Sequence, residues 1–111
     1  KKPGNVVVQG WCADYPDPEN FLDVLFHSGS NFNYTNMADA ELDDLLDQAR
    51  VALDPAERLK LYAQAEAHIL DQFLAIPLST STSAILINPR VKDYTLTAIG
   101  VRILDSVSLE P

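Results

Sequence analysis

The sequence predicts a mixed α/β fold in which a buried strand is followed by three helices and then by a second, longer strand. Three adjacent valines, Val6–Val8, are typical of a strand that is covered on both faces. Apolar residues recur at helical spacing across residues 40–72. Residues 74–88 combine β-branched side chains with a run of small hydroxyl side chains, and the apolar flanks of that run favour a strand.

Composition places the chain among globular proteins and excludes several classes of function. Hydrophobic residues make up 47% of the 111 residues and charged residues 22%, and a chain of this length can bury one core. Sixteen acidic against eight basic residues give a net charge of −8, which disfavours nucleic acid as a partner. The single cysteine, Cys12, forms no disulfide within the chain. No apolar run approaches the roughly 20 residues of a membrane-spanning helix.

The first strand is expected over residues 5–11, and its setting suggests that the chain is part of a larger protein. Lys1–Gly4 leads almost directly into the valines, with neither an initiator methionine nor a signal peptide before them. A strand that is buried on both faces needs a neighbour on each side, and few candidates are present. We therefore expect the sheet to be completed by sequence outside these 111 residues.

The first helix is expected to begin at Asp17, after a turn-rich stretch that contains Pro16 and Pro18. Asp17 is suited to the N-cap and Pro18 to the first helical position, while Glu19 favours the positive end of the helix dipole. The expected apolar face consists of Phe21, Leu22, Leu25 and Phe26.

Residues 40–72 predict two packed helices with a tight connection. The apolar stripe of the first is Leu42, Leu45, Leu46, Ala49 and Leu53, and that of the second is Leu59, Tyr62, Ala63, Ile69, Leu70 and Phe73. Asp54 can cap the Glu57 amide while Glu57 reaches back to the Asp54 amide, so this pair ends one helix and begins the next. Glu66 lies within the second stripe and is therefore expected to meet a hydrogen-bonding partner or to reach the edge of the core.

The rest of the chain predicts extended structure. A long strand is expected over residues 74–88, a turn at Asn88–Arg90 and one more short strand at Val101–Leu104. The hydroxyl run Ser79–Ser83 is also typical of a flexible linker, but its apolar flanks favour the strand.

The sequence supports neither a catalytic nor a metal centre. His27 and His68 both lie in predicted helices without a companion motif, so a catalytic triad built on Cys12 or a serine is not supported. The acidic residues between 39 and 47 match a calcium loop poorly because leucines interrupt them, and a solvated helix face is the preferred interpretation. We therefore expect no cofactor and no enzymatic activity.

A binding segment is predicted where the first strand runs into the following loop. Its residues are Gly10, Trp11, Cys12, Asp14 and Tyr15. They bring two aromatic rings and a carboxylate to one strand end, a combination that is common in binding clefts. From the residues alone a structural interpretation is preferred, with Trp11 in the core, Asp14 in a local turn and Asp17 as a helix cap.

Several short motifs stand in a distinctive order along the chain. They are Gly10-Trp11, Ala13-Asp14-Tyr15-Pro16-Asp17-Pro18, Asn20-Phe21-Leu22, Asp43, Leu46, Asp54, Arg58, Leu61-Tyr62, Ala65-Glu66, Ile76-Pro77-Leu78 and Asn88-Pro89-Arg90-Val91. Each motif is weak by itself. In this order and spacing they resemble the C-terminal part of the extracellular solute-binding proteins of peptide-importing ABC transporters, the oligopeptide- and dipeptide-binding family. The resemblance spans nearly all of the chain.

The resemblance implies a fold and a division of the chain. Members of this family are several times longer and have two lobes that close on the ligand, the class II fold of periplasmic binding proteins. Residues 1–82 would form the C-terminal portion of the second lobe, and residues 83–111 would return to the first lobe. The strand expected over residues 74–88 would then cross the hinge.

The resemblance also implies a binding function. In oligopeptide-binding members, the strand that matches Gly10–Cys12 pairs with the peptide backbone, and the acid that matches Asp14 holds the amino terminus of the peptide. Trp11 and Tyr15 would be walls of the site. The implied partners are a peptide and the membrane permease of an ABC importer. The implied location is the periplasm or the outer face of a bacterial cell membrane, with any N-terminal lipid anchor outside these residues.

Two alternatives stay open. A stand-alone interaction module would present the helices of residues 39–73 as a docking surface for another protein. A member of the same family could instead bind a sugar, nickel or haem. Acid–base hydrolysis by Asp14 and Asp17 is the least favoured function, because these residues are better explained as an anchor and a helix cap.

Overall fold

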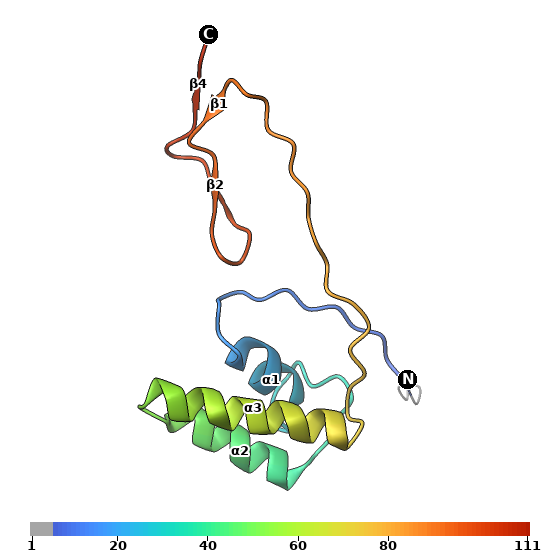
Figure 1. The fold of residues 1–111 in the computed structure, drawn as a ribbon. Coiled ribbons are helices and arrows are strands. Elements are labelled where there is room, and N and C mark those ends of the chain that lie inside the picture. The colour runs from blue at the N-terminus through green and yellow to red at the C-terminus, as the bar shows by residue number, and fades with distance from the viewer. Residues whose placement is uncertain (1–5) are drawn as a thin grey trace. The chain divides into compact units, whose positions relative to one another are not determined.

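Two long helices, α2 (Ala40–Val51) and α3 (Pro55–Asp71), form a helical hairpin in the computed structural model, which describes residues 6–111 (Figure 1). The connection is short because Asp54 Oδ1 accepts a hydrogen bond of 2.8 Å from the Glu57 N–H and caps α3. This predicted cap is confirmed. Among the described residues, the Glu57 carboxylate makes no return bond to the Asp54 N–H, so the second half of the predicted capping box is absent there.

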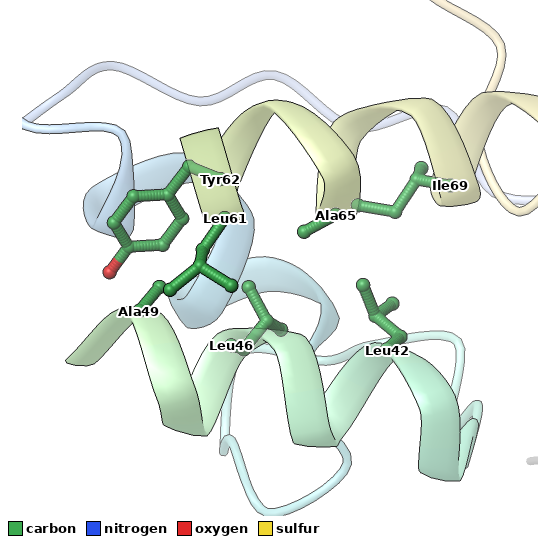
Figure 2. Packing of buried hydrophobic residues seen from close by; sticks show 7 residues of the cluster. All are labelled: Leu42, Leu46, Ala49, Leu61, Tyr62, Ala65 and Ile69. Carbon is green, nitrogen blue, oxygen red and sulfur yellow. The ribbon is translucent and has the colours of Figure 1, made fainter. Parts of the chain in front are cut away.

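The core lies between α2 and α3, and α1 (Glu19–Phe26) packs against both helices. Figure 2 shows the side chains of α2 and α3 facing each other across the interface. The buried apolar residues are Leu42, Leu46, Ala49, Leu61, Tyr62, Ala65 and Ile69. Each large apolar side chain that is fully buried contributes about 1.5–3 kcal/mol, so the burial of this cluster stabilises the helical unit.

The buried face of α3 differs from the predicted stripe. Tyr62 and Ile69 are buried as expected. The exposed members of the predicted stripe are Leu59, Ala63, Leu70 and Phe73. Leu61 and Ala65 take their place in the core, because α3 has apolar residues on two faces and packing on α2 decides which face is buried. Glu66 is exposed to solvent, so it needs no buried partner.

Helix α1 begins one residue later than predicted. Pro18 is the N-cap rather than the first helical residue. Asp17 nevertheless satisfies one free donor of the first turn, because its Oδ1 accepts a hydrogen bond of 2.9 Å from the Glu19 N–H. Asp17 therefore bonds to the first turn of α1 as predicted, but from the position before the N-cap.

The two predicted long strands are absent from the described residues. Residues 6–11 form no strand, and Val6 and Val8 are 85% and 82% exposed, so the prediction of a buried strand is wrong for this structure. Asn5, the first residue of that prediction, lies outside the described residues. Residues 74–88 form no strand either. A strand exists only when its N–H and C=O groups pair with a neighbouring backbone, and neither segment has such a neighbour within residues 6–111.

The chain separates into two units, one ending at Ile76 and the other comprising residues 77–111. The second unit contains short antiparallel ladders in which β1 pairs with β4 and β2 with β3. The strands are β1 (Val91–Lys92), β2 (Thr95–Leu96), β3 (Arg102–Ile103) and β4 (Ser108–Leu109). The predicted turn is confirmed by the Arg90 N–H, which donates to Asn88 Oδ1 at 3.0 Å, and β3 matches the predicted last strand.

Candidate functional site

The loop of residues 11–17 is anchored on the first turn of α1 by Asn20. Asn20 is 2% exposed, and its Oδ1 accepts two hydrogen bonds, from Trp11 Nε1–H at 3.1 Å and from the Asp14 N–H at 3.0 Å. The Trp11 ring also packs edge-on against Phe32, with the ring centroids 5.3 Å apart. These contacts hold the loop in one shape without the support of a strand.

The aromatic neighbour of Trp11 comes from the loop between α1 and α2. Asn33 orders that loop, because its buried Nδ2 donates to the carbonyl oxygens of His27 at 3.3 Å and of Met37 at 2.8 Å. Phe32 is therefore held beside Trp11 by the backbone of a well-bonded loop.

The two carboxylates of the loop differ in what they contact. Asp17 is bound by Arg58 of α3 in a two-point ion pair, with Nη1–Oδ2 at 2.6 Å and Nη2–Oδ1 at 2.9 Å. The hydrogen bond from Arg58 is the main cause that lowers the pKa of Asp17. Asp14 is exposed, and within residues 6–111 no group donates a hydrogen bond to its carboxylate. Asp14 is therefore available to a ligand, whereas Asp17 is engaged in the structure.

The remaining predicted site residues lie on either side of Asp14. The Tyr15 hydroxyl donates to the Glu19 carboxylate, and this bond is the main cause that raises the pKa of Tyr15. Gly10 and Cys12 are exposed, and a methyl group in place of the Gly10 hydrogen would meet nothing within 4 Å. Across the described part of the chain, the N–H and C=O groups of residues 10–12 make no backbone hydrogen bond.

The structure thus brings Trp11 and Asp14 together on one acceptor, Asn20 Oδ1. Gly10, which precedes Trp11, and Cys12, which lies between Trp11 and Asp14, are exposed and make no backbone hydrogen bond within residues 6–111. Asn20 and Arg58 belong to the motifs of the family resemblance, but sequence reasoning assigned them no part in the site. Their partners in the loop lie six to forty-one positions away, so no local pattern reveals these contacts.

The two histidines have structural roles at helix ends. His68 Nε2 lies 3.0 Å from Asp39 Oδ2, at the N-terminus of α2, and its Nδ1 lies 3.8 Å from the Glu41 carboxylate. His27 Nδ1 accepts a hydrogen bond of 2.9 Å from the Gly29 N–H. No group of three or more potential metal ligands gathers anywhere in residues 6–111.

We expect the His68 contact to make the stability of the helical unit depend on pH. Its hydrogen bond with Asp39 raises the pKa of His68 and lowers the pKa of Asp39. A histidine with a raised folded-state pKa contributes stability that is complete below its unfolded pKa of about 6.5 and is lost as the pH rises through the folded pKa. The aspartate contribution is present above about pH 4 and is lost as the pH falls. The pair is therefore most stabilising between these limits.

His68→Gln should remove the decline of stability between about pH 6 and pH 8, an effect of about 0.5 kcal/mol. Urea titrations of the full-length protein across this range measure it. His27→Gln is the matched control and should keep the decline. An unchanged pH dependence in His68→Gln would contradict the assignment.

A shallow depression of about 290 Å³ is lined in part by Phe32, the residue whose ring packs against Trp11. Its lining residues are Asp23, Val24, His27, Gly29, Ser30, Phe32 and Arg50. The two charged residues of the lining neutralise each other, because Arg50 Nη2 lies 2.8 Å from Asp23 Oδ1. The depression therefore presents no unpaired charge to a ligand, in contrast to Asp14.

Comparison with known proteins finds clear relatives. No protein-family model matches the chain. It is 38% identical over 91% of its length to the heme-binding protein A of Haemophilus influenzae and covers 19% of that protein. It is 33% identical over 94% of its length to the dipeptide-binding protein of Escherichia coli, of which it covers 20%. It is 32% identical over 82% of its length to the periplasmic oligopeptide-binding protein OppA of Salmonella typhimurium, of which it covers 17%.

The chain therefore spans about a fifth of the length of the curated relatives that it matches. No helix within residues 6–111 has the length and apolar character to cross a membrane. Besides the heme-binding protein, relatives that are 31–33% identical over 82–94% of the chain are named dipeptide-, di/tripeptide- and oligopeptide-binding proteins, which confirms the resemblance drawn from the motifs. Over most of its length the chain is therefore similar to dipeptide- and oligopeptide-binding proteins, the group whose motifs it shares.

Proposed function

We propose that the protein is the peptide-binding component of an ABC importer, which captures peptides in the periplasm or at the outer face of the cell membrane and delivers them to a membrane permease. Relatives named dipeptide-binding and periplasmic oligopeptide-binding proteins support this function and location. Similarity to these binding proteins favours it over a stand-alone interaction module and over an enzyme. Residues 1–82 and 83–111 are assigned by the same proposal to the second and first lobes of a two-lobed protein.

The exposed carboxylate of Asp14 is the observation that carries the proposal. An α-amino group has a pKa of about 7.7–8.0, so the amino terminus of a peptide is mostly protonated at neutral pH. A carboxylate without another partner can accept a charge-assisted hydrogen bond from it, which contributes about 1.5–3 kcal/mol. Asp17 lies three residues away but is occupied by Arg58, so only one acid of the loop is suited to this role.

The open backbone of residues 10–12 supplies the second part of the proposed site. An extended peptide that lies alongside it can add a strand, and main-chain hydrogen bonds of this kind are common to all peptide sequences. Gly10 favours close approach because it has no side chain, and Trp11 and Tyr15 offer aromatic walls. The rest of the site belongs to sequence outside this chain.

Haem is the main competing ligand, since one relative is named a heme-binding protein. The peptide is preferred because several relatives are named for dipeptides, tripeptides or oligopeptides. An exposed carboxylate is also a natural partner for an amine.

Asp14→Ala in the full-length protein should weaken the binding of trialanine by about 10- to 100-fold, which corresponds to the loss of one charge-assisted hydrogen bond. Isothermal titration calorimetry at pH 7 with dialanine, trialanine and tetra-alanine measures the effect. Asp44→Ala, which removes an exposed carboxylate from α2, is the matched control and should bind as the unmodified protein does. Unchanged affinity in Asp14→Ala would rule out this anchor, and binding of haem but of none of these peptides would overturn the peptide assignment.

A further inference from the structure

We propose that Asn20 is a positioning residue that directs the Asp14 carboxylate and thereby sets the preference of the site for a free amino terminus. The inference rests on the proposed function and deepens it. Asn20 is not expected to touch the ligand, since its side chain is almost completely buried beneath the loop. Its effect on binding is transmitted through the backbone of Asp14.

The geometry that supports this role is a single oxygen atom shared by two donors. Asn20 Oδ1 accepts from the indole N–H of Trp11 and from the backbone N–H of Asp14, at 3.1 and 3.0 Å. Trp11 and Asp14 are both proposed ligand contacts, and they lie three positions apart in a segment without secondary structure. One buried amide oxygen therefore fixes the spacing between two parts of the site.

The position of Asp14 depends on its hydrogen bond to Asn20, whereas Tyr15 and Trp11 each have a further contact that holds them. Tyr15 has a separate tie through its hydroxyl to Glu19. Trp11 has a separate contact through its ring to Phe32. Within residues 6–111, Asp14 makes a single hydrogen bond, from its backbone N–H to Asn20 Oδ1. If this hydrogen bond is lost, the direction of the Asp14 Cα–Cβ bond is no longer fixed. The position of the carboxylate is then no longer fixed either.

The ion pair between Arg58 and Asp17 cannot replace this function. It ties the start of α1 to α3 at a point three residues beyond Asp14. It therefore orients the helix that bears Asn20, whereas Asn20 itself transmits that orientation to Asp14. A binding group works best when the residues behind it hold it within about 0.5 Å of the productive geometry.

The test compares two substitutions at residue 20 in the full-length protein. Asn20→Leu has a similar size but no acceptor, and Asn20→Asp keeps an oxygen acceptor at the same position. The readout is the ratio of the dissociation constants for N-acetyl-trialanine and trialanine, measured by calorimetry at pH 7. We expect the ratio to fall by about fivefold or more in Asn20→Leu. In Asn20→Asp the ratio should be equal to or higher than that of the unmodified protein.

This ratio separates positioning from general stability. A variant that is merely less stable loses active protein or affinity for both ligands equally, and the ratio does not move. The matched control is Asp39→Leu, because Asp39 Oδ1 also accepts two hydrogen bonds, in its case from the backbone N–H groups of Glu41 and Leu42. It removes the same kind of acceptor at another helix start, and its ratio should stay unchanged.

Asp14→Ala completes the experiment and distinguishes the two proposals. If Asp14→Ala abolishes the preference for the free amine and Asn20→Leu leaves it intact, the positioning role is overturned while the anchor stands. If Asp14→Ala also keeps the preference, the anchor and the positioning role both fail. Should Asn20→Leu not fold, Asn20→Ser takes its place, because a serine hydroxyl is too short to reach both donors.

Discussion

Replacing Leu46 with alanine is expected to lower the free energy of opening of the α2–α3 hairpin by about 3 kcal/mol, within the range of about 2–5 kcal/mol found for buried leucines. Leu46 is fully buried and faces the core side chains of α3 (Figure 2). The cluster has only seven buried members, so few neighbours are free to move into the space that the side chain leaves. The loss therefore combines the transfer free energy of the deleted atoms with the cost of a cavity.

Amide hydrogen exchange of α3 in the full-length protein measures this opening free energy. Leu53→Ala is the matched control: Leu53 was predicted to belong to the apolar stripe of α2 but lies in the connection after it and is 99% exposed. It should change the opening free energy by less than about 0.5 kcal/mol. Equal effects of the two substitutions would contradict the placement of the core.

Arg50→Met is expected to destabilise the contact between α1 and α2 by about 3 kcal/mol, because it leaves a buried carboxylate without its partner. The Asp23 side chain is 8% exposed, and Arg50 binds it through Nη2 at 2.8 and 2.9 Å and through Nε at 3.2 Å. The first cause that raises the pKa of Arg50 is the hydrogen bond with Asp23. Methionine keeps the aliphatic stem of Arg50 and removes only the charge and its donors.

The measurement is hydrogen exchange of the α1 amides, with a double variant as the decisive comparison. Arg50→Met combined with Asp23→Asn should recover most of the lost stability, since no unpaired charge is then buried. Lys60→Met is the control for an exposed pair. Lys60 Nζ lies 3.4 Å from Glu57 on the surface of α3, and its loss should cost less than about 1 kcal/mol. A cost for Arg50→Met no greater than this would show that Asp23 does not depend on its partner.

The helices were predictable because their signals are local. The Asp54 cap and its amide partner lie three residues apart, so the end of one helix and the start of the next follow from neighbouring side chains. The start of α1 was predicted to within one residue for the same reason. The buried face of α3 was predicted only in part, because Leu61 and Leu59 are equally apolar and their spacing does not reveal where α2 will lie.

The strands were not predictable to the same degree. The valines of residues 6–8 and the apolar residues of 74–88 have the composition of strands, yet composition alone does not provide the neighbouring backbone that a strand requires. The short ladders of residues 91–109 form because their partners lie in the same unit and a turn at Asn88–Arg90 starts the segment. Strand formation thus depends on whether a partner backbone is available, which the composition of a segment does not reveal.

Of the two acids in the loop that carries the predicted binding segment, the structure tests only the capping role of Asp17. Asp14 and Asp17 were separated into anchor and cap by sequence reasoning, and the structure finds Asp17 bonded to the first turn of α1 and to Arg58. The roles proposed for Gly10, Cys12 and Asp14 toward a ligand stay predictions. Asn20 escaped notice because both of its partners lie outside the helix to which it belongs.

Sequence alone predicted a capped helical hairpin and an acidic and aromatic loop before the first helix, and it indicated which family the motifs resemble. The tertiary structure decided which face of α3 is buried and that Arg58 forms an ion pair with Asp17. It also decided that Asn20 Oδ1 accepts hydrogen bonds from both Trp11 and Asp14. The difference has a physical cause. Helix caps and periodicity arise from residues within four positions of one another. The buried face arises only when α3 packs on α2, and the shared acceptor arises when the loop folds back onto α1 over six to nine positions.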